Sequence, residues 1–120
     1  MNVNRMDSHG GWVASPLNLV RFMVHVDGFS TVADKLPSNL VTSMTTPSSV
    51  YASYAKGWWV NSYNSWWHGG SLPGTMSILV RTQSGYTWSF ICNKRDSGDI
   101  DALMWQIVNG VTTWPNANFF

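Results

Sequence analysis

The residues whose types and spacing could support chemistry lie within residues 66–74, WWHGGSLPG. The imidazole of His68 can donate, accept or carry a proton near neutral pH, and Gly69 and Gly70 follow it directly. Glycines weaken the interior of a strand, and the usual compensation is the close approach of a ligand or of another backbone. The segment therefore predicts a substrate-facing edge strand and a following turn. A bulge or bend at the two glycines, beside a structural histidine, is the alternative.

Short strands are predicted around this motif. The segments GWWVNSY, SWWHGG, TMSILVRTQ and GYTWSFICNK are rich in β-branched and aromatic residues, and turn residues separate them. Met76, Ile78 and Val80 share one face of a strand, while Leu79 and Ile91 make the opposite face apolar as well. A sheet with two apolar faces is expected to be sandwiched between helices.

The first helix is predicted to begin at Ser15 and Pro16. A serine hydroxyl caps free backbone N–H groups, and the fixed φ of proline suits the first helical position. This helix should run to about Asp27 and stop at Gly28, because glycine commonly follows a helix end.

Two further helices are predicted from apolar residues at helical spacing. The first covers residue 38 to about residue 45, and the second begins at Ser97 or Asp99 and ends at Gly110. Asp99 and Asp101 are expected to favour the positive end of that last helix, not to act as paired acids.

The predicted fold class is α+β, with a three-stranded antiparallel sheet and flanking helices. Residues 1–120 would form a single partial domain, with a helical segment at 1–50, strands at 51–96, a helix at 97–110 and a tail at 111–120. Three strands with two apolar faces leave one face unmatched and at least one edge open. A missing N-terminal segment or a second copy of the chain should therefore complete the sheet.

Composition narrows the function classes. Hydrophobic residues make up 44% of the chain and charged residues only 11%, so part of the surface should be covered. Nucleic acid is not an expected partner, because phosphate binding needs clustered cations and only Lys94 and Arg95 are adjacent. The first residues lack the pattern of a signal peptide, and no stretch approaches the roughly 20 apolar residues of a membrane span. The compartment stays unknown.

The single cysteine, Cys92, cannot form an internal disulfide. No metal or other cofactor is predicted, because His9, His25 and His68 have no helical or strand-alternate ligand spacing. Eight tryptophans are present, and the doublets at 58–59 and 66–67 should each place one ring on either sheet face. Trp67 is the ring expected to line a substrate cleft.

Two blocks of the sequence resemble a known family. Residues 10–23, GGWVASPLNLVRFM, are similar to the glycine-glycine, aromatic, helix-start block in the middle of penicillin-binding-protein and class C β-lactamase relatives. Residues 57–93 resemble their later block, in which a strand carries a Lys/His-Thr/Gly-Gly triplet after a segment near YGLGW. The resemblance covers roughly residues 5–109. It implies the C-terminal part of the β-lactamase/transpeptidase-like fold.

The resemblance also implies a function. The chain would be a C-terminal fragment of a serine hydrolase of esterase, amidase or D-amino-acid peptidase type, from a family that is often periplasmic or secreted. His68, Gly69 and Gly70 take the three triplet positions, and Ser71 lies where the family's strand donates a backbone N–H to the oxyanion hole. The implied substrate is a small acyl ester or amide.

The family's nucleophile is a Ser-x-x-Lys, with a Tyr/Ser-x-Asn that shuttles protons. Both normally precede the block at 10–23, and only nine residues precede it here, so the nucleophile is expected outside this chain. Ser53 with Lys56 and Ser62 with Asn64 match the two patterns upstream of His68. We interpret both matches as chance, because serine and lysine at i and i+3 in an extended segment point to opposite faces.

Two other functions stay open. One is a small autonomous serine esterase that uses Ser53 and Lys56 and works as an oligomer. The other is a carbohydrate-binding module, in which exposed tryptophan rings stack on sugars.

Overall fold

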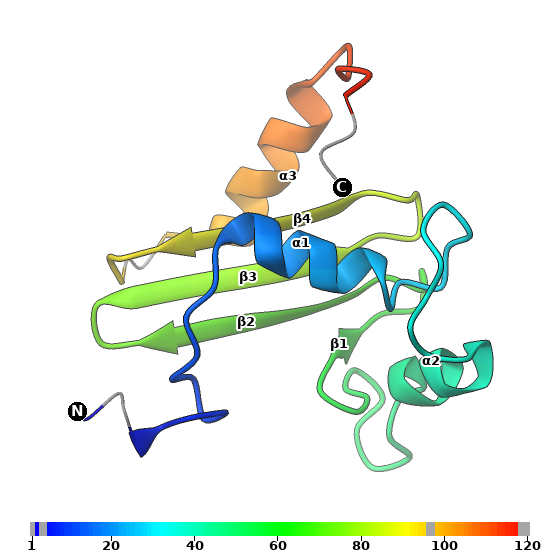
Figure 1. Cartoon of the computed structure of the whole chain (residues 1–120), viewed down its shortest axis with the longest axis horizontal. Coiled ribbons are helices and arrows are strands. Elements are labelled where there is room, and N and C mark those ends of the chain that lie inside the picture. Colours follow the sequence, from blue (N-terminus) through cyan, green and yellow to red (C-terminus); the bar gives the residue numbers. More distant parts are fainter. Residues whose placement is uncertain (1, 3–4, 96–97, 118–120) are drawn as a thin grey trace.

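The computed structural model describes residue 2 and residues 5–95 and 98–117. A four-stranded antiparallel sheet in the order β1-β2-β3-β4 forms its centre (Figure 1). The strands are β1 (Trp59–Val60), β2 (Trp66–Leu72), β3 (Thr75–Arg81) and β4 (Thr87–Cys92). The helices are α1 (Pro16–Val24), α2 (Ser38–Thr45) and α3 (Ile100–Gly110). The α+β class is confirmed.

The expected number of three strands is wrong, because the GWWVNSY segment also pairs into the sheet through the two residues of β1. A tight turn joins β1 to β2. The side chain of Asn61 accepts hydrogen bonds from the backbone N–H groups of Tyr63 and Ser65, at 3.1 and 3.0 Å. Asn64 adopts the left-handed conformation, with φ at 55°, which asparagine tolerates better than most residues.

Helix α1 starts where the sequence predicts. Ser15 and Asn18 form a reciprocal capping box, and Pro16 occupies the first helical turn. The expected end at Asp27 is wrong, since the helix ends at Val24 with His25 as its C-cap. The next residues leave the helical path, and Gly28 takes a φ of +75° that suits glycine.

The other two helices agree with the sequence pattern. Helix α2 covers Ser38–Thr45. Helix α3 has Asp99 as its N-cap, whose carboxylate accepts from the Ala102 N–H at 3.0 Å. The alternative start at Ser97 falls outside the described residues. Among the described residues, none of the helices combines the length and apolarity needed to cross a membrane.

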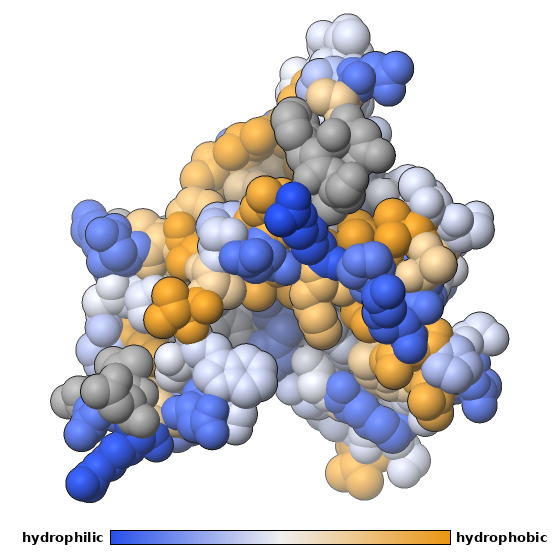
Figure 2. Space-filling model, in the orientation of Figure 1, coloured by the Kyte–Doolittle hydropathy of each residue, from blue (hydrophilic) through white to orange (hydrophobic). Residues whose placement is uncertain are grey.

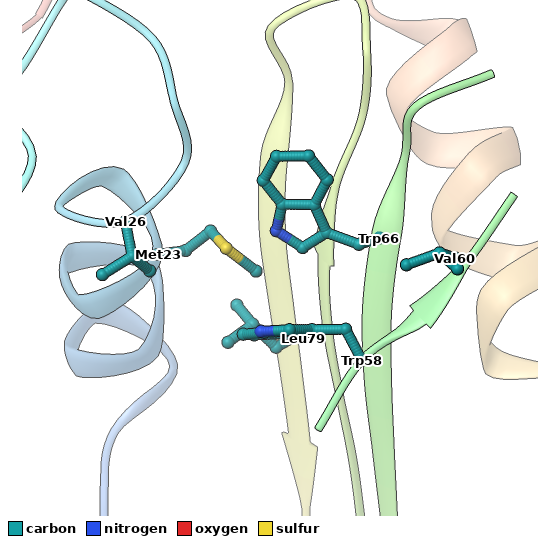
Figure 3. Packing of buried hydrophobic residues seen from close by; sticks show 6 residues of the cluster. All are labelled: Met23, Val26, Trp58, Val60, Trp66 and Leu79. Carbon is teal, nitrogen blue, oxygen red and sulfur yellow. The ribbon is translucent and has the colours of Figure 1, made fainter. Parts of the chain in front are cut away.

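Hydrophobic side chains pack on both faces of the sheet. On one face, α1 lies across β3 and β4 (Figure 1). Its cluster contains Met23, Val26, Trp58, Val60, Trp66 and Leu79 (Figure 3). On the other face, the α3 residue Val108 packs with Ile78, Val80 and Trp88. The expectation of one unmatched face is therefore wrong, because each face carries a helix.

The radius of gyration is 15.2 Å, slightly above the value of about 14 Å for a compact domain of this length.

The outer surface of the helices keeps much apolar area. Leu17 and Phe22 on α1 are 43% and 52% exposed, and Trp12 just before it is 77% exposed. Figure 2 shows hydrophobic side chains between hydrophilic ones on the face that carries α1. The helices cover the sheet, while their own outer sides stay uncovered.

A buried arginine ties the α1 end of the fold to strand β2. Arg81 is 3% exposed, and its guanidinium lies 3.8 Å from the Trp66 ring centroid and 3.9 Å from that of Phe29. Its Nε donates to the Asp27 carbonyl at 3.0 Å, and Nη1 donates to the Asn64 carbonyl at 2.7 Å. The arginine thus links the loop after α1 with the turn before β2.

The core packing leads to a first prediction. Met23 is fully buried between α1 and the sheet, so Met23→Ala leaves a cavity and should lower the free energy of unfolding by about 2 to 5 kcal/mol. Urea unfolding followed by tryptophan fluorescence measures it. Val13→Ala is the control, since Val13 is 96% exposed and should change stability by no more than about 0.5 kcal/mol. Equal effects of the two substitutions would contradict this packing.

The Arg81 cluster leads to a second prediction. Burial raises the pKa of Asp27 above its ordinary 3.8, although the Phe29 N–H and the Arg81 charge act in the opposite direction. Folded Asp27 therefore holds its proton to higher pH than the unfolded chain does. The resulting stability is complete below about pH 4 and is lost as pH rises through the raised pKa.

Asp27→Asn removes this titration and keeps an oxygen acceptor for the Phe29 N–H. As the pH rises above about 4, the free energy of unfolding should fall more steeply for the wild type than for the variant. Urea titrations at several pH values measure both slopes. Asp101, whose pKa burial also raises, is present in both proteins and cancels. Parallel pH profiles would show that Asp27 is not perturbed.

Candidate functional site

Strand β2 is paired unequally on its two sides. All seven of its residues pair with β3, whereas β1 pairs only with Trp66 and Trp67. In Figure 1, β1 lies beside one end of β2, and no other strand pairs along the rest of that side, where the N-terminal segment passes near the far end of β2. Within the described residues, one side of residues 68–72 is fully paired with β3, and their other side is therefore an open sheet edge. The sequence predicted that this whole segment is an edge strand. That expectation holds only for residues 68–72, because β1 pairs with Trp66 and Trp67 and is itself the outer strand of the sheet.

The direction of each backbone group along β2 follows from the hydrogen bonds beside β1. In an antiparallel ladder, alternate residues direct their N–H and C=O groups toward opposite neighbours. The Asn61 N–H donates to the Ser65 carbonyl at 3.2 Å, so the next hydrogen-bonded pair on this side is Trp59 with Trp67. Because this alternation continues along β2, Gly69 and Ser71 also direct their backbone groups toward the open edge.

The opposite side of the sheet gives the same result. The Thr82 N–H donates to the Tyr86 carbonyl at 2.8 Å, which sets the alternation between β3 and β4. By that alternation, Leu79 and Ser77 direct their backbone groups toward β2, where their partners are His68 and Gly70. Strand β2 thus uses the groups of His68 and Gly70 to hold β3. The backbone groups of Gly69 and Ser71 point the other way and pair with no strand among the described residues.

The two glycines lie in a regular strand. Pairing between β2 and β3 runs one to one through Gly69 and Gly70, so the bulge interpretation is wrong. A Cβ at Gly70 would lie only 2.7 Å from the Ser77 hydroxyl oxygen. The absence of a side chain at this position therefore makes room for the hydroxyl of the neighbouring strand. At Gly69 the nearest atom to an added Cβ is the Ser77 carbonyl oxygen at 3.6 Å, an ordinary contact.

His68 is exposed, yet both of its ring nitrogens have close polar neighbours. Nδ1 lies 2.7 Å from the carbonyl oxygen of Gly69, and Nε2 lies 3.0 Å from the hydroxyl of Tyr54. The two rings also meet edge to face, with centroids 6.0 Å apart. Tyr54 was not among the residues predicted from sequence. Its place in the YAKGW segment, which corresponds to the YGLGW-like block, was the signal that could have pointed to it.

The Ser53 and Lys56 pair does not form a helical Ser-x-x-Lys. Ser53 lies in a turn, and its carbonyl accepts from the Val60 N–H at 2.9 Å. The ammonium of Lys56 donates to the Ser43 carbonyl at 2.7 Å, near the end of α2. The lysine charge thus neutralises a helix C-terminus.

Ser62 and Asn64 belong to the turn between β1 and β2. The side-chain amide of Asn64 donates to the Gln83 side chain at 2.9 Å, and the backbone carbonyl of Asn64 accepts from the Arg81 guanidinium. These bonds give Asn64 a structural role in joining two turns of the sheet. Ser62 is exposed in the same turn.

Trp67 was expected to line a substrate cleft, but the structure places its ring elsewhere. Its ring is half-buried and packs against the cluster between the sheet and α3. Trp58 and Trp66 are buried on the α1 face, and Trp59 is the partly exposed member of its doublet at 36%. Each doublet therefore places its two rings on opposite faces, and Trp67 packs against the cluster that includes Val108 of α3.

Within the described part of the chain, two surface hollows border residues singled out from the sequence. A shallow one of about 350 Å³ borders Gly69, Gly70 and Ser71 on the side of α3, where Met76 and Ile78 form its floor. The larger one, about 490 Å³, lies between α2 and the Arg81 cluster. His68 does not line the smaller hollow, because it pairs with Leu79 and its side chain lies on the α1 face of the sheet. We therefore place the candidate site at the open edge, which the smaller hollow adjoins on the other face. Among the described residues, no group of three or more His, Cys, Asp or Glu side chains could hold a metal ion.

Comparison with known proteins places these features in a family. A family model described as Beta-lactamase matches residues 1–111. Comparisons with curated proteins and with solved structures gave no match. The matched region contains the capped helix α1, the HGG strand β2 with its open edge, and α3. The chain belongs to the β-lactamase family.

Proposed function

We propose that this chain is the substrate-cradling, C-terminal part of a serine hydrolase of the esterase, amidase or D-amino-acid peptidase type. An acyl ester or amide lies along residues 68–72 as an added strand. The backbone N–H of Ser71 donates to the oxyanion, and the serine nucleophile comes from a segment outside this chain. The observation that carries the proposal is the open edge, at which Gly69 and Ser71 direct their backbone groups outward.

The backbone geometry suits acyl transfer. An extended acyl substrate pairs with a sheet edge through its own N–H and C=O groups, and the edge-facing groups of Gly69 and Ser71 are two residues apart, as an added strand requires. A fixed N–H that points at the developing oxyanion contributes strongly to catalysis, because it needs no reorganisation during the reaction. Gly69 and Gly70 add no side chains of their own beside this edge.

The nucleophile is assigned to another segment for a geometric reason. Lys56, the one candidate activator of Ser53, donates to the Ser43 carbonyl. A lysine held at a helix C-terminus is not available as a base for a serine. The exposed apolar side chains of Trp12, Leu17 and Phe22 fit a partner surface, supplied by the nucleophile-bearing segment of the hydrolase or by a second copy of the chain.

A carbohydrate-binding module is not favoured. Sugar rings stack on flat aromatic platforms, whereas Tyr51 and Tyr54 meet Trp59 edge to face at interplanar angles of 73° and 81°. This cluster resembles packing at a strand edge more than a stacking surface.

The edge can be tested by replacing one backbone N–H. Ser71→Pro removes the edge-facing N–H without removing a bond to β3, and proline is tolerated on edge strands. Ser71→Ala is the matched control, because it keeps the N–H. The probe is N-acetyl-alanyl-alanine methyl ester, titrated into the ¹⁵N-labelled full chain and followed by NMR.

We expect the largest amide shifts at Gly69 and Ser71 in the wild type, with the Ser71→Ala variant alike and binding lost in Ser71→Pro. Strand β4 provides an internal comparison, since it forms the other edge of the sheet. Shifts that concentrate on β4, or binding that survives in Ser71→Pro, would rule out the proposed edge.

The position of the nucleophile can be tested by covalent labelling. The folded full chain is treated with a fluorophosphonate, and the adduct is located by mass spectrometry. Neither Ser53 nor Ser62 should be labelled above the level of the denatured chain, because neither has an activating base. Labelling of Ser53 that Lys56→Ala abolishes would instead support the autonomous esterase.

A further inference from the structure

The hydrogen bonds around His68 determine which ring nitrogen carries its proton. The Gly69 carbonyl can only accept, so Nδ1, at 2.7 Å, must be the protonated nitrogen. In the neutral ring Nε2 is then an acceptor, and the Tyr54 hydroxyl at 3.0 Å is its donor. The two contacts agree on one tautomer.

We propose that Tyr54 is a positioning residue for the site, whose hydroxyl fixes His68 in the Nδ1–H tautomer and holds its ring against the open edge of β2. The inference rests on the proposed function for its role in catalysis, but the tautomer itself does not depend on that function. Tyr54 lies fourteen residues before His68 in the sequence. Only the fold brings the two side chains together.

The position of Tyr54 is itself well fixed. Its backbone forms an isolated bridge with Trp59, and its carbonyl accepts from the Ser48 N–H at 2.8 Å. Its ring packs edge to face on the Trp59 ring, with centroids 5.1 Å apart. Tyr51 packs on the same Trp59 ring from a distance of 5.9 Å. A hydroxyl held this way can orient an exposed imidazole that would otherwise rotate freely.

The arrangement has a consequence for the open edge. The Gly69 carbonyl faces that edge, so the Nδ1–H bond covers one of its lone pairs and leaves the N–H groups of Gly69 and Ser71 uncovered. The edge then presents donors to an incoming carbonyl in preference to acceptors.

The test is a spectroscopic measurement on the full chain. Two-bond ¹H–¹⁵N NMR spectra at a pH where His68 is neutral distinguish the protonated ring nitrogen from the unprotonated one. In the wild type, Nδ1 should be protonated and Nε2 unprotonated. In Tyr54→Phe, which keeps the ring packing on Trp59, the ratio of the tautomers should move toward Nε2–H by roughly two- to tenfold, the range that one net hydrogen bond supports.

Tyr51→Phe is the matched control, because it removes a hydroxyl from a ring on the same Trp59 and should leave the His68 tautomer unchanged. An unchanged tautomer ratio in Tyr54→Phe would overturn the proposal. So would a wild-type spectrum in which Nε2 carries the proton, and that result needs no variant to fold. If the wild-type chain showed the Nδ1–H tautomer of His68 but bound no substrate at the edge, the result would count against the proposed function instead.

Discussion

The pairing of β2 is the constraint on which the site depends. Backbone groups alternate in direction along an antiparallel strand, and among the described residues β2 pairs beyond Trp67 with a strand on one side only. The same alternation that holds β2 to β3 through His68 and Gly70 must therefore expose the groups of Gly69 and Ser71. A longer β1 would satisfy those groups and close the edge. The turn around Asn61 and the shortness of β1 are thus as much a part of the site as the HGG motif.

The rest of the fold keeps this edge in place. Trp66 anchors the start of β2 in the core between α1 and the sheet. Arg81 stacks on the Trp66 ring and donates hydrogen bonds to the loop after α1 and to the turn before β2. Burial lowers the pKa of Arg81, although the charges of Asp27 and Asp34 partly offset that effect. The end of β2 that pairs with strands on both sides is therefore the end anchored in the core, and the glycines extend away from it. A site built on a strand anchored in this way is held more precisely than one on a loop.

Local patterns predicted the elements better than their pairing. The cap at Ser15 and the apolar spacing of residues 38–45 located two helices, because capping and periodicity are properties of adjacent residues. The GWWVNSY segment was recognised as strand-like but not counted in the sheet, since only two of its residues pair. The site was predicted in part. The HGG edge follows from its residues, whereas the contact of Tyr54 with His68 and the packing of Trp67 against the cluster that includes Val108 are tertiary. No spacing in the sequence encodes them.

Amide hydrogen exchange along β2, measured residue by residue by NMR on the full chain, tests the central claim most directly. Amides bonded to β3 open only with the sheet, while amides at a bare edge exchange without unfolding. The account predicts slow exchange at His68 and Gly70 and fast exchange at Gly69 and Ser71. Equal protection of all four amides would contradict it, because the edge would then already be paired.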